Sequence, residues 1–334
     1  MARIGYCCKT VVPDVKHGIR NISEMNFRST TAKWCREHPK EAEQRLWEIT
    51  EHNCRALLLM VEYVGGLDEH RRMVRVGSDI WPLATHPQVE FFWDKNDARD
   101  MAGKMLEQVG DYCRSHNIRL SQHPGQFVCF SSDRDEVVEN SITEFEYHAE
   151  IARRMGYGAS WHDHGYKINI HVSGHKGIDG FRQVLKRLSP EARNLITVEN
   201  DENVYGLDDV LELADELPIV LDVHHHWVAT GEYIQTDDDR VRRVIESWRG
   251  VRPIIHYSLS REDILVGHNP DTLPDRNALM HSGINRQKLR SHSDMYWNRA
   301  ANRWAASFLE EFDIMCEAKC KNLASAAFTV ELNL

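Results

Sequence analysis

Histidine and acidic side chains stand at the ends of successive short apolar segments of this chain. The segments RLSQH, INIH, ITVE and PIIH each change from aliphatic residues to a histidine or a glutamate at their last position. The residues placed in this way are Asp79, His123, His171, Glu199, Asp222, His225, His256 and Glu317. A mixed set of imidazoles and carboxylates suits Zn²⁺, Mn²⁺ or Fe²⁺ better than Ca²⁺, which prefers oxygen ligands alone. One such histidine would mean little, but the repetition along the chain predicts a metal centre.

The number of these side chains predicts more than one ion. Several carboxylates gathered in one place would repel one another, whereas divalent cations make the same cluster favourable. Seven or more ligands are too many for a single ion, so we expect two or three ions, with Glu199 as a bridging ligand. Clustered divalent ions are used to hydrolyse phosphodiesters. Glu199, His256 and Glu317 are the catalytic candidates.

The elements that position these residues follow a βαβα pattern, which is typical of a parallel sheet. The predicted strands are 2–7, 73–78, 118–123, 167–172, 195–200, 218–223, 253–258 and 313–318, and helical periodicity fills 41–63, 96–115, 135–155, 207–216, 237–248 and 295–311. Eight such units predict an α/β fold, a single (β/α)8 TIM barrel whose active site lies at the C-terminal ends of the strands. No repeat or linker divides the chain, so residues 1–334 are expected to form one domain.

Composition narrows the functional classes. A formal charge of −10 argues against broad electrostatic adhesion to DNA or membranes, although a metal-binding nuclease is compatible with it because the carboxylates hold cations. The 19 histidines suggest metal binding. No apolar run reaches the roughly 18 residues of a membrane span, and the start MARIGYCCKT has no apolar signal region, so a cytoplasmic protein is expected. The eight cysteines show no CxxC pair and are expected to be reduced.

Five strings, in order along the chain, resemble the UV damage endonucleases: RIGY, LSQHPGQF, VENDE, LDVHHH and EAK. That family is similar to endonuclease IV in its barrel and its three-metal site, and it nicks duplex DNA immediately 5′ of cyclobutane dimers, 6-4 photoproducts and some other lesions. The resemblance implies Mn²⁺ as the usual metal, with Zn²⁺ or Mg²⁺ as alternatives, and damaged double-stranded DNA as the partner of a monomeric enzyme.

The resemblance also implies roles for individual residues. The family ligands fall on His123, His171, Glu199, Asp222, His225, His256 and Glu317, and Asp79 stands where some members carry histidine. For the last ligand, His292 in HSDMY matches better than His281 in MHSG. Gln126 and Phe127 match a wedge that enters the duplex at the lesion, Tyr6 matches a lesion-pocket tyrosine, and His226 is a candidate for binding phosphate.

Two positions depart from the family pattern, and the histidine triplet leaves a separate question of register. Ile254 stands where family members often carry a carboxylated lysine that bridges metals, and period-two alternation places residue 254 on the face of His256. Lys9 and Thr10 replace an expected asparagine. Strict alternation would place His224, not His225, on the face of Asp222, whereas the family spacing favours His225.

Three other functions compete with a lesion-specific endonuclease. An abasic-site endonuclease of the endonuclease IV type would share the barrel and the metals, but HPGQ followed by an aromatic residue argues against it. A sugar isomerase would use two ions and a catalytic lysine. A damage-binding protein with weakened catalysis is compatible with the loss of the lysine at position 254.

Overall fold

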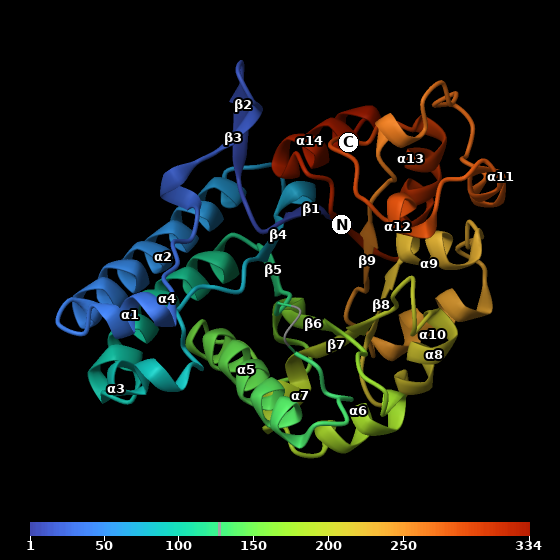
Figure 1. The fold of residues 1–334 in the computed structure, drawn as a ribbon. Helices are drawn as coiled ribbons and strands as arrows, with labels where there is room; N and C mark the ends of the chain where they lie inside the picture. The colour runs from blue at the N-terminus through green and yellow to red at the C-terminus, as the bar shows by residue number, and fades with distance from the viewer. Residues whose placement is uncertain (126–127) are drawn as a thin grey trace.

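Eight parallel strands close into a barrel in a computed structural model that describes residues 1–125 and 128–334 (Figure 1). Around the barrel the strands follow the order β1, β10, β9, β8, β7, β6, β5, β4. They are β1 Ile4–Cys7, β4 Met73–Val76, β5 Arg119–Gln122, β6 Lys167–His171, β7 Ile196–Glu199, β8 Ile219–Asp222, β9 Ile254–Tyr257 and β10 Asp313–Cys316. Each lies within one of the predicted strands, and the predicted TIM barrel is confirmed.

The helices surround the barrel (Figure 1). They are α1 Ala32–Glu37, α2 Ala42–Gly65, α3 Glu90–Trp93, α4 Asn96–Ser115, α5 Asp135–Arg154, α6 Gly177–Leu185, α7 Pro190–Leu195, α8 Leu207–Val210, α9 Val223–Thr230, α10 Asp239–Ser247, α11 Arg276–His281, α12 Arg286–Leu289, α13 Arg299–Ala306 and α14 Lys321–Glu331. The helices predicted at 41–63, 96–115 and 135–155 are found nearly in full. Those at 207–216, 237–248 and 295–311 begin or end short of the predicted bounds. The remaining helices were not predicted: α1, α3, α6, α7, α9, α11, α12 and α14.

The two stretches that look irregular in sequence do contain ordered elements. Residues 11–40 form an antiparallel hairpin, β2 Val11–Asp14 with β3 Gly18–Asn21, which projects from the barrel, and then α1 (Figure 1). The second stretch, from 261 onward, carries α11 and leads into α12. Leu289 of α12 is fully buried against Trp227 and Val228 of α9. This contact holds the late segment over the barrel strand ends.

The barrel interior is layered, because alternate residues of each strand face inward. Ile254, Met315 and Val220 belong to a small apolar cluster together with Met73 and Cys7. Their chain neighbours, such as Ile255, pack instead into the larger core that includes the apolar residues of the helices. Ile254 therefore faces the barrel interior, one inward position before His256, as the alternation predicts.

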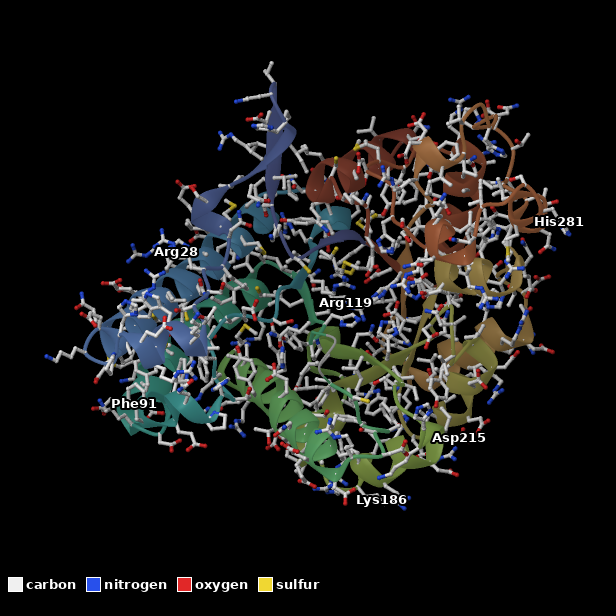
Figure 2. The ribbon with its side chains drawn as sticks, in the orientation of Figure 1. Arg28, Phe91, Arg119, Lys186, Asp215 and His281 are labelled. Atoms are coloured by element: carbon white, nitrogen blue, oxygen red, sulfur yellow. The ribbon has the colours of Figure 1, made fainter. Side chains whose placement is uncertain are left out.

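An ionic layer closes the N-terminal end of the barrel. Asp313, the first residue of β10, is completely buried, and its carboxylate accepts hydrogen bonds from Arg119 at 2.7 Å, Arg252 at 3.0 Å and the backbone N–H of Arg3 at 2.8 Å. Figure 2 shows Arg119 inside the ring of elements. Removing one partner of a buried ion pair leaves an uncompensated charge.

We predict that Asp313→Ala lowers the free energy of unfolding by about 3–5 kcal/mol, because three donors lose their buried acceptor. Urea denaturation followed by circular dichroism measures the change. Asp294→Ala is the control, since Asp294 is 75% exposed and lies 3.8 Å from Lys319, and it should change stability by less than about 1 kcal/mol. Equal losses in the two variants would contradict a structural role for the ionic layer.

Candidate metal centre

The residues predicted from strand ends come together at one mouth of the barrel. His171, Glu199 and Asp222 are the last residues of β6, β7 and β8, and His256 is the third residue of β9. His123 and Glu317 follow directly after β5 and β10. Because the strands are parallel, these ends lie on the same side of the barrel. Two register pairs, His171 with Glu199 and Asp222 with His256, place the side chains directly opposite each other.

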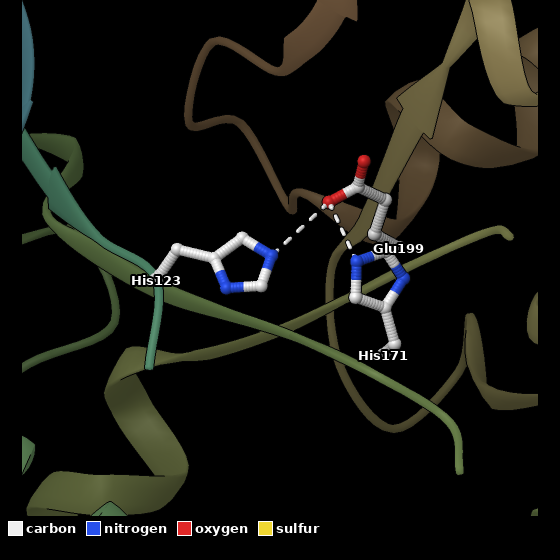
Figure 3. A group of neighbouring side chains, drawn as sticks. All are labelled: His123, His171 and Glu199. Carbon is white, nitrogen blue, oxygen red and sulfur yellow. Dashed lines mark ion pairs between the residues drawn. The ribbon is translucent and has the colours of Figure 1, made fainter. Parts of the chain in front are cut away.

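Glu199 is the residue on which this cluster converges. Its Oε2 lies 3.7 Å from His123 Nε2 and 3.8 Å from His171 Nε2, and Figure 3 shows both imidazoles turned toward this oxygen. Oε1 lies 2.9 Å from His256 Nδ1, and Asn169 donates a hydrogen bond to Oε2. Burial raises the pKa of Glu199, but the histidines, His256 first, bring that pKa well below its usual range. Glu199 is therefore an anion at neutral pH.

Asp222 and His225 form a second part of the centre. Asp222 is fully buried, and its Oδ1 accepts a hydrogen bond from the His225 backbone N–H at 2.6 Å. Its Oδ2 has no hydrogen-bond partner among the residues that the structure describes. Burial, together with the charges of Glu199 and Glu317, raises the pKa of Asp222 to about 7. Burial lowers the pKa of His225, yet Asp222 and the neighbouring glutamates raise it to a net value of about 9.

The start of α9 explains which histidine of the triplet faces the centre. Asp222 caps α9, so the chain turns helical at Val223 and strand alternation no longer applies. His225 Nε2 comes within 3.9 Å of Asp222 Oδ2. His224 is instead buried away from it, with Nδ1 2.8 Å from the Ser258 hydroxyl.

Glu317 forms the third part, between two histidines and an arginine. His256 Nδ1 lies 3.4 Å from Glu317 Oε1, and His292 Nδ1 lies 3.9 Å from Oε2. Arg75 of β4 donates a hydrogen bond to Oε1 from a buried position. Burial raises the pKa of Glu317, but Arg75 and then His256 bring it well below its usual range. The carboxylate is thus charged and already paired with a cation of the protein.

The donor set fits divalent ions. Three groups have ligand atoms within 4.8 Å of one another: His123, His171 and Glu199; Glu199, Asp222 and His225; and Asp222, His256 and Glu317. Buried polar atoms are normally hydrogen-bonded, so the unpartnered Oδ2 of Asp222 is a position that an ion would satisfy. Burial lowers the pKa of His123 to about 3, which keeps that imidazole neutral and able to bind a metal.

The structure gives different outcomes for two predicted ligands, His292 and Asp79. His292 stands beside Glu317, with Nδ1 2.9 Å from the Glu317 carbonyl oxygen, whereas His281 ends α11 at the periphery of the molecule (Figure 2). Among the described residues, neither His292 nor Asp79 belongs to one of the three ligand groups, but His292 lies next to the third group whereas Asp79 is exposed. The structure thus favours His292 over His281 and leaves Asp79 outside the cluster.

Tyr6 and His226, two of the predicted DNA-contacting residues, do not line the mouth. Tyr6 is 1% exposed, packs in the core shared with the helices and has its hydroxyl 2.8 Å from that of Thr10. His226 is buried, with Nε2 3.0 Å from Glu232 Oε2. These placements argue against the lesion-pocket and phosphate-binding roles expected of Tyr6 and His226. Gln126 and Phe127, the expected wedge, lie outside the described residues.

Sequence reasoning missed three polar residues of the site. Arg75 and Asn169 interrupt the apolar strands MVRV and KINIH at inward positions, a signal that alternation could have used. Glu202, in VENDE, lies with Oε2 3.7 Å from His225 Nε2. It follows the strand end by three residues, and only the fold of the loop brings it back to the centre.

A cleft of about 730 Å³ opens beside the centre. Three site histidines line one part of it: His171, His225 and His292. The remainder is formed by the loops after β6 and β7 and by Arg290 and Ser291. A polymer that reached the histidines through this cleft would contact these loops on its way.

The chain is similar to known proteins over most of its length. Residues 2–333 match the family described as UV-endonuclease UvdE. A UV DNA damage endonuclease of Bacillus thuringiensis subsp. konkukian (strain 97-27) is 28% identical over 306 residues, covering 88% of this chain and 85% of the relative. Another from Bacillus mycoides (strain KBAB4) is 27% identical over 316 residues, covering 91% and 88%.

Solved structures share the fold. The crystal structure of SacUVDE superposes with a TM-score of 0.72 at 24% identity, covering 100% of this chain and 99% of that one. The crystal structure of AsfvAP:AG matches with a TM-score of 0.50 at 13% identity, covering 85% and 91%. Within the described part of the chain, no helix is long and apolar enough to cross a membrane.

We predict that ion binding releases protons and strengthens as pH rises from about 6 to 8. The pKa of Asp222 is raised to about 7 and that of His225 to about 9, so below these values each carries a proton that an ion must displace. Calorimetric titration of chelator-stripped protein with Mn²⁺, in buffers of different ionisation heat, counts the protons. Asp222→Asn should release fewer of them. An affinity independent of pH would contradict this reading of the site.

Proposed function

The chain belongs to the UV-endonuclease UvdE family, and on this premise we propose that it is a metal-dependent endonuclease of DNA repair that hydrolyses the phosphodiester 5′ of UV photoproducts. The observation that carries the proposal is the set of three ligand groups around Glu199 and Asp222 at the barrel mouth. The curated relatives that match across most of the chain are named UV DNA damage endonucleases, which supports the same activity.

The residues of the three groups would hold the ions. Glu199 and Asp222 each belong to two groups and are therefore the proposed bridging ligands, while the histidines supply neutral nitrogen donors. Bound ions would supply a hydroxide nucleophile and stabilise the charge that develops on the phosphate. Asn169, through its hydrogen bond to Glu199, keeps that carboxylate aimed into the mouth. His292, carried by the segment after α12, completes the donor set next to Glu317.

Recognition of the lesion is proposed from the family resemblance. Gln126 and Phe127 would enter the duplex at the damaged step, where cyclobutane dimers and 6-4 photoproducts have weakened stacking. Inserting a wedge costs a few kcal/mol of stacking energy, and the cost is smallest where the stack is already disturbed. This selectivity would come from the loop after β5, while the cut would be made by the barrel mouth next to it.

We propose Mn²⁺ as the metal, with three ions held by the three ligand groups. The ion of the third site, formed by Asp222, His256 and Glu317, is expected to bind most weakly for two reasons. Arg75 already neutralises Glu317, and Ile254 supplies no ligand at the inward position next to His256. A buried cation lowers the affinity of a neighbouring site for another cation.

The activity is tested with three duplexes: one with a cyclobutane dimer, one with an abasic site and one undamaged. With Mn²⁺ we expect a nick 5′ of the dimer and none in undamaged DNA, and chelator should abolish it. Glu199→Gln should lower the rate at least about 100-fold, since it removes the shared ligand charge. Glu139→Gln, whose side chain is 59% exposed on α5, is the matched control. A wild-type protein that leaves the dimer duplex intact with Mn²⁺ would rule out the proposed function.

Arg75 gives a second prediction, which needs no activity measurement. In Arg75→Met the buried Glu317 loses its partner, so the apo protein should unfold at a lower temperature and Mn²⁺ should raise the melting temperature by more than in wild type. Arg119→Met removes the buried arginine at the opposite end of the barrel. Its loss of stability should be the same with and without Mn²⁺, and an equal response of both variants to Mn²⁺ would contradict the weak third site.

A further inference from the structure

A buried carboxylate next to the metal centre holds an arginine at the edge of the cleft. Glu202 is 5% exposed, and its Oε1 lies 2.9 Å from the Arg290 guanidinium, while its Oε2 faces His225 Nε2 at 3.7 Å. Asn203 donates a hydrogen bond to Oε1 at 2.7 Å. Glu202 thus connects a candidate ligand of the metals to a cation on a separate segment.

The segment that carries Arg290 is firmly docked. Leu289 is buried against α9, and its carbonyl oxygen accepts a hydrogen bond from Ser260 at 2.6 Å. Arg286, one helical turn before Arg290, donates to the Glu202 carbonyl oxygen at 3.2 Å. Both arginines therefore reach the same residue from one face of α12 and its end. Two residues beyond Arg290, His292 lies beside Glu317.

Arg290 remains available to a ligand. Its side chain is 51% exposed and lines the same cleft as His171, His225 and His292. Within the described part of the chain, Glu202 is the only partner of its guanidinium. The other acidic residue of the cleft, Asp201, has its carboxylate occupied by the backbone N–H groups of Asn203 and Val204. The free face of Arg290 is thus a cationic donor within the cleft.

We propose that Arg290 binds a backbone phosphate of the DNA strand that is cut, and that Glu202 is the positioning residue that aims it. This inference rests on the proposed function. A strand whose phosphodiester lies at the metal centre carries further phosphates about every 3.4 Å along the helix axis, so neighbouring phosphates pass through the cleft. Arginine offers a planar fork of donors that matches phosphate. In a chain with a net charge of −10, such local cations must provide the attraction.

Glu202 contributes by fixing the arginine before DNA arrives. A free arginine side chain loses rotamer freedom when it binds, and a guanidinium already held at one nitrogen loses less. The same carboxylate restrains His225, so the phosphate contact and the metal ligand share one rigid support.

The test measures binding in chelator, where no cutting occurs, with a fluorescent duplex containing one cyclobutane dimer, between about 50 and 200 mM KCl. Arg290→Met should raise Kd about tenfold near 0.1 M and reduce the slope of log K against log salt by about 0.9, which is one phosphate contact. Arg290→Lys should retain the slope but bind more weakly than wild type. Glu202→Gln should retain the slope and raise Kd by less than Arg290→Met.

Uncharged methylphosphonate linkages, placed one at a time near the cut site, locate the contact. One position should weaken wild type and leave Arg290→Met unaffected, because the two changes remove the same interaction. Arg55→Met is the control: it also removes one charge, but Arg55 is 69% exposed on α2 and pairs with Glu51. Melting temperatures confirm that all variants are folded.

The outcomes separate this inference from the function on which it rests. Wild type that neither prefers nor nicks the dimer duplex would refute the proposed function. Wild type that does both, with Arg290→Met matching its Kd and salt slope, would refute only the role of Arg290. Tighter binding by Glu202→Gln would show that the carboxylate competes with phosphate, and would refute its positioning role.

Discussion

The shared Glu199 carboxylate is the interaction on which the centre depends. It is 2% exposed and lies within 4 Å of histidines from four different segments of the chain, namely His123, His171, His225 and His256. A carboxylate this deep is costly to bury unless cations or donors surround it. Parallel strands with fixed register supply them, because His171 pairs directly with Glu199 and Asp222 pairs directly with His256.

The two ends of the barrel handle buried charge in opposite ways. At the N-terminal end, the single acid Asp313 is satisfied by the arginines around it. The mouth holds three acids, Glu199, Asp222 and Glu317. Among the described arginines and lysines, only Arg75 pairs with one of them, Glu317. Within the same described residues, Asp222 Oδ2 has no hydrogen-bond partner. The apolar layer containing Ile254 and Met315 separates the two. The buried charge of the N-terminal end is therefore balanced by protein groups, whereas the donor set at the mouth fits divalent ions.

Ile254, which stands where family members often carry a lysine, affects the number of ligands at the mouth. An isoleucine there extends the apolar layer up to His256, so the mouth has fewer ligands on the β9 side, where Glu317 is held by Arg75. The late segment around α12 meets the mouth near this same side, where His292 lies beside Glu317, and it brings Arg290 to Glu202 of the loop after β7. The proposed metal ligand His292 and the proposed phosphate contact Arg290 thereby lie on the same docked segment.

The sequence alone determined the barrel and most of its mouth, because both follow from local periodicity. Alternation along strands, with a polar residue at the last inward position, is enough to find His123, His171, Glu199, Asp222, His256 and Glu317. Only the tertiary structure decided the rest. It chose His225 over His224, because Asp222 caps a helix that begins at once. It placed Tyr6 in the outer core and Asp79 away from the ligand groups, and it brought Arg75 to Glu317 across 242 residues. Alternation can place Arg75 inward, but its pairing with Glu317 and the paths of the loops depend on long-range contacts that no local pattern of residues encodes.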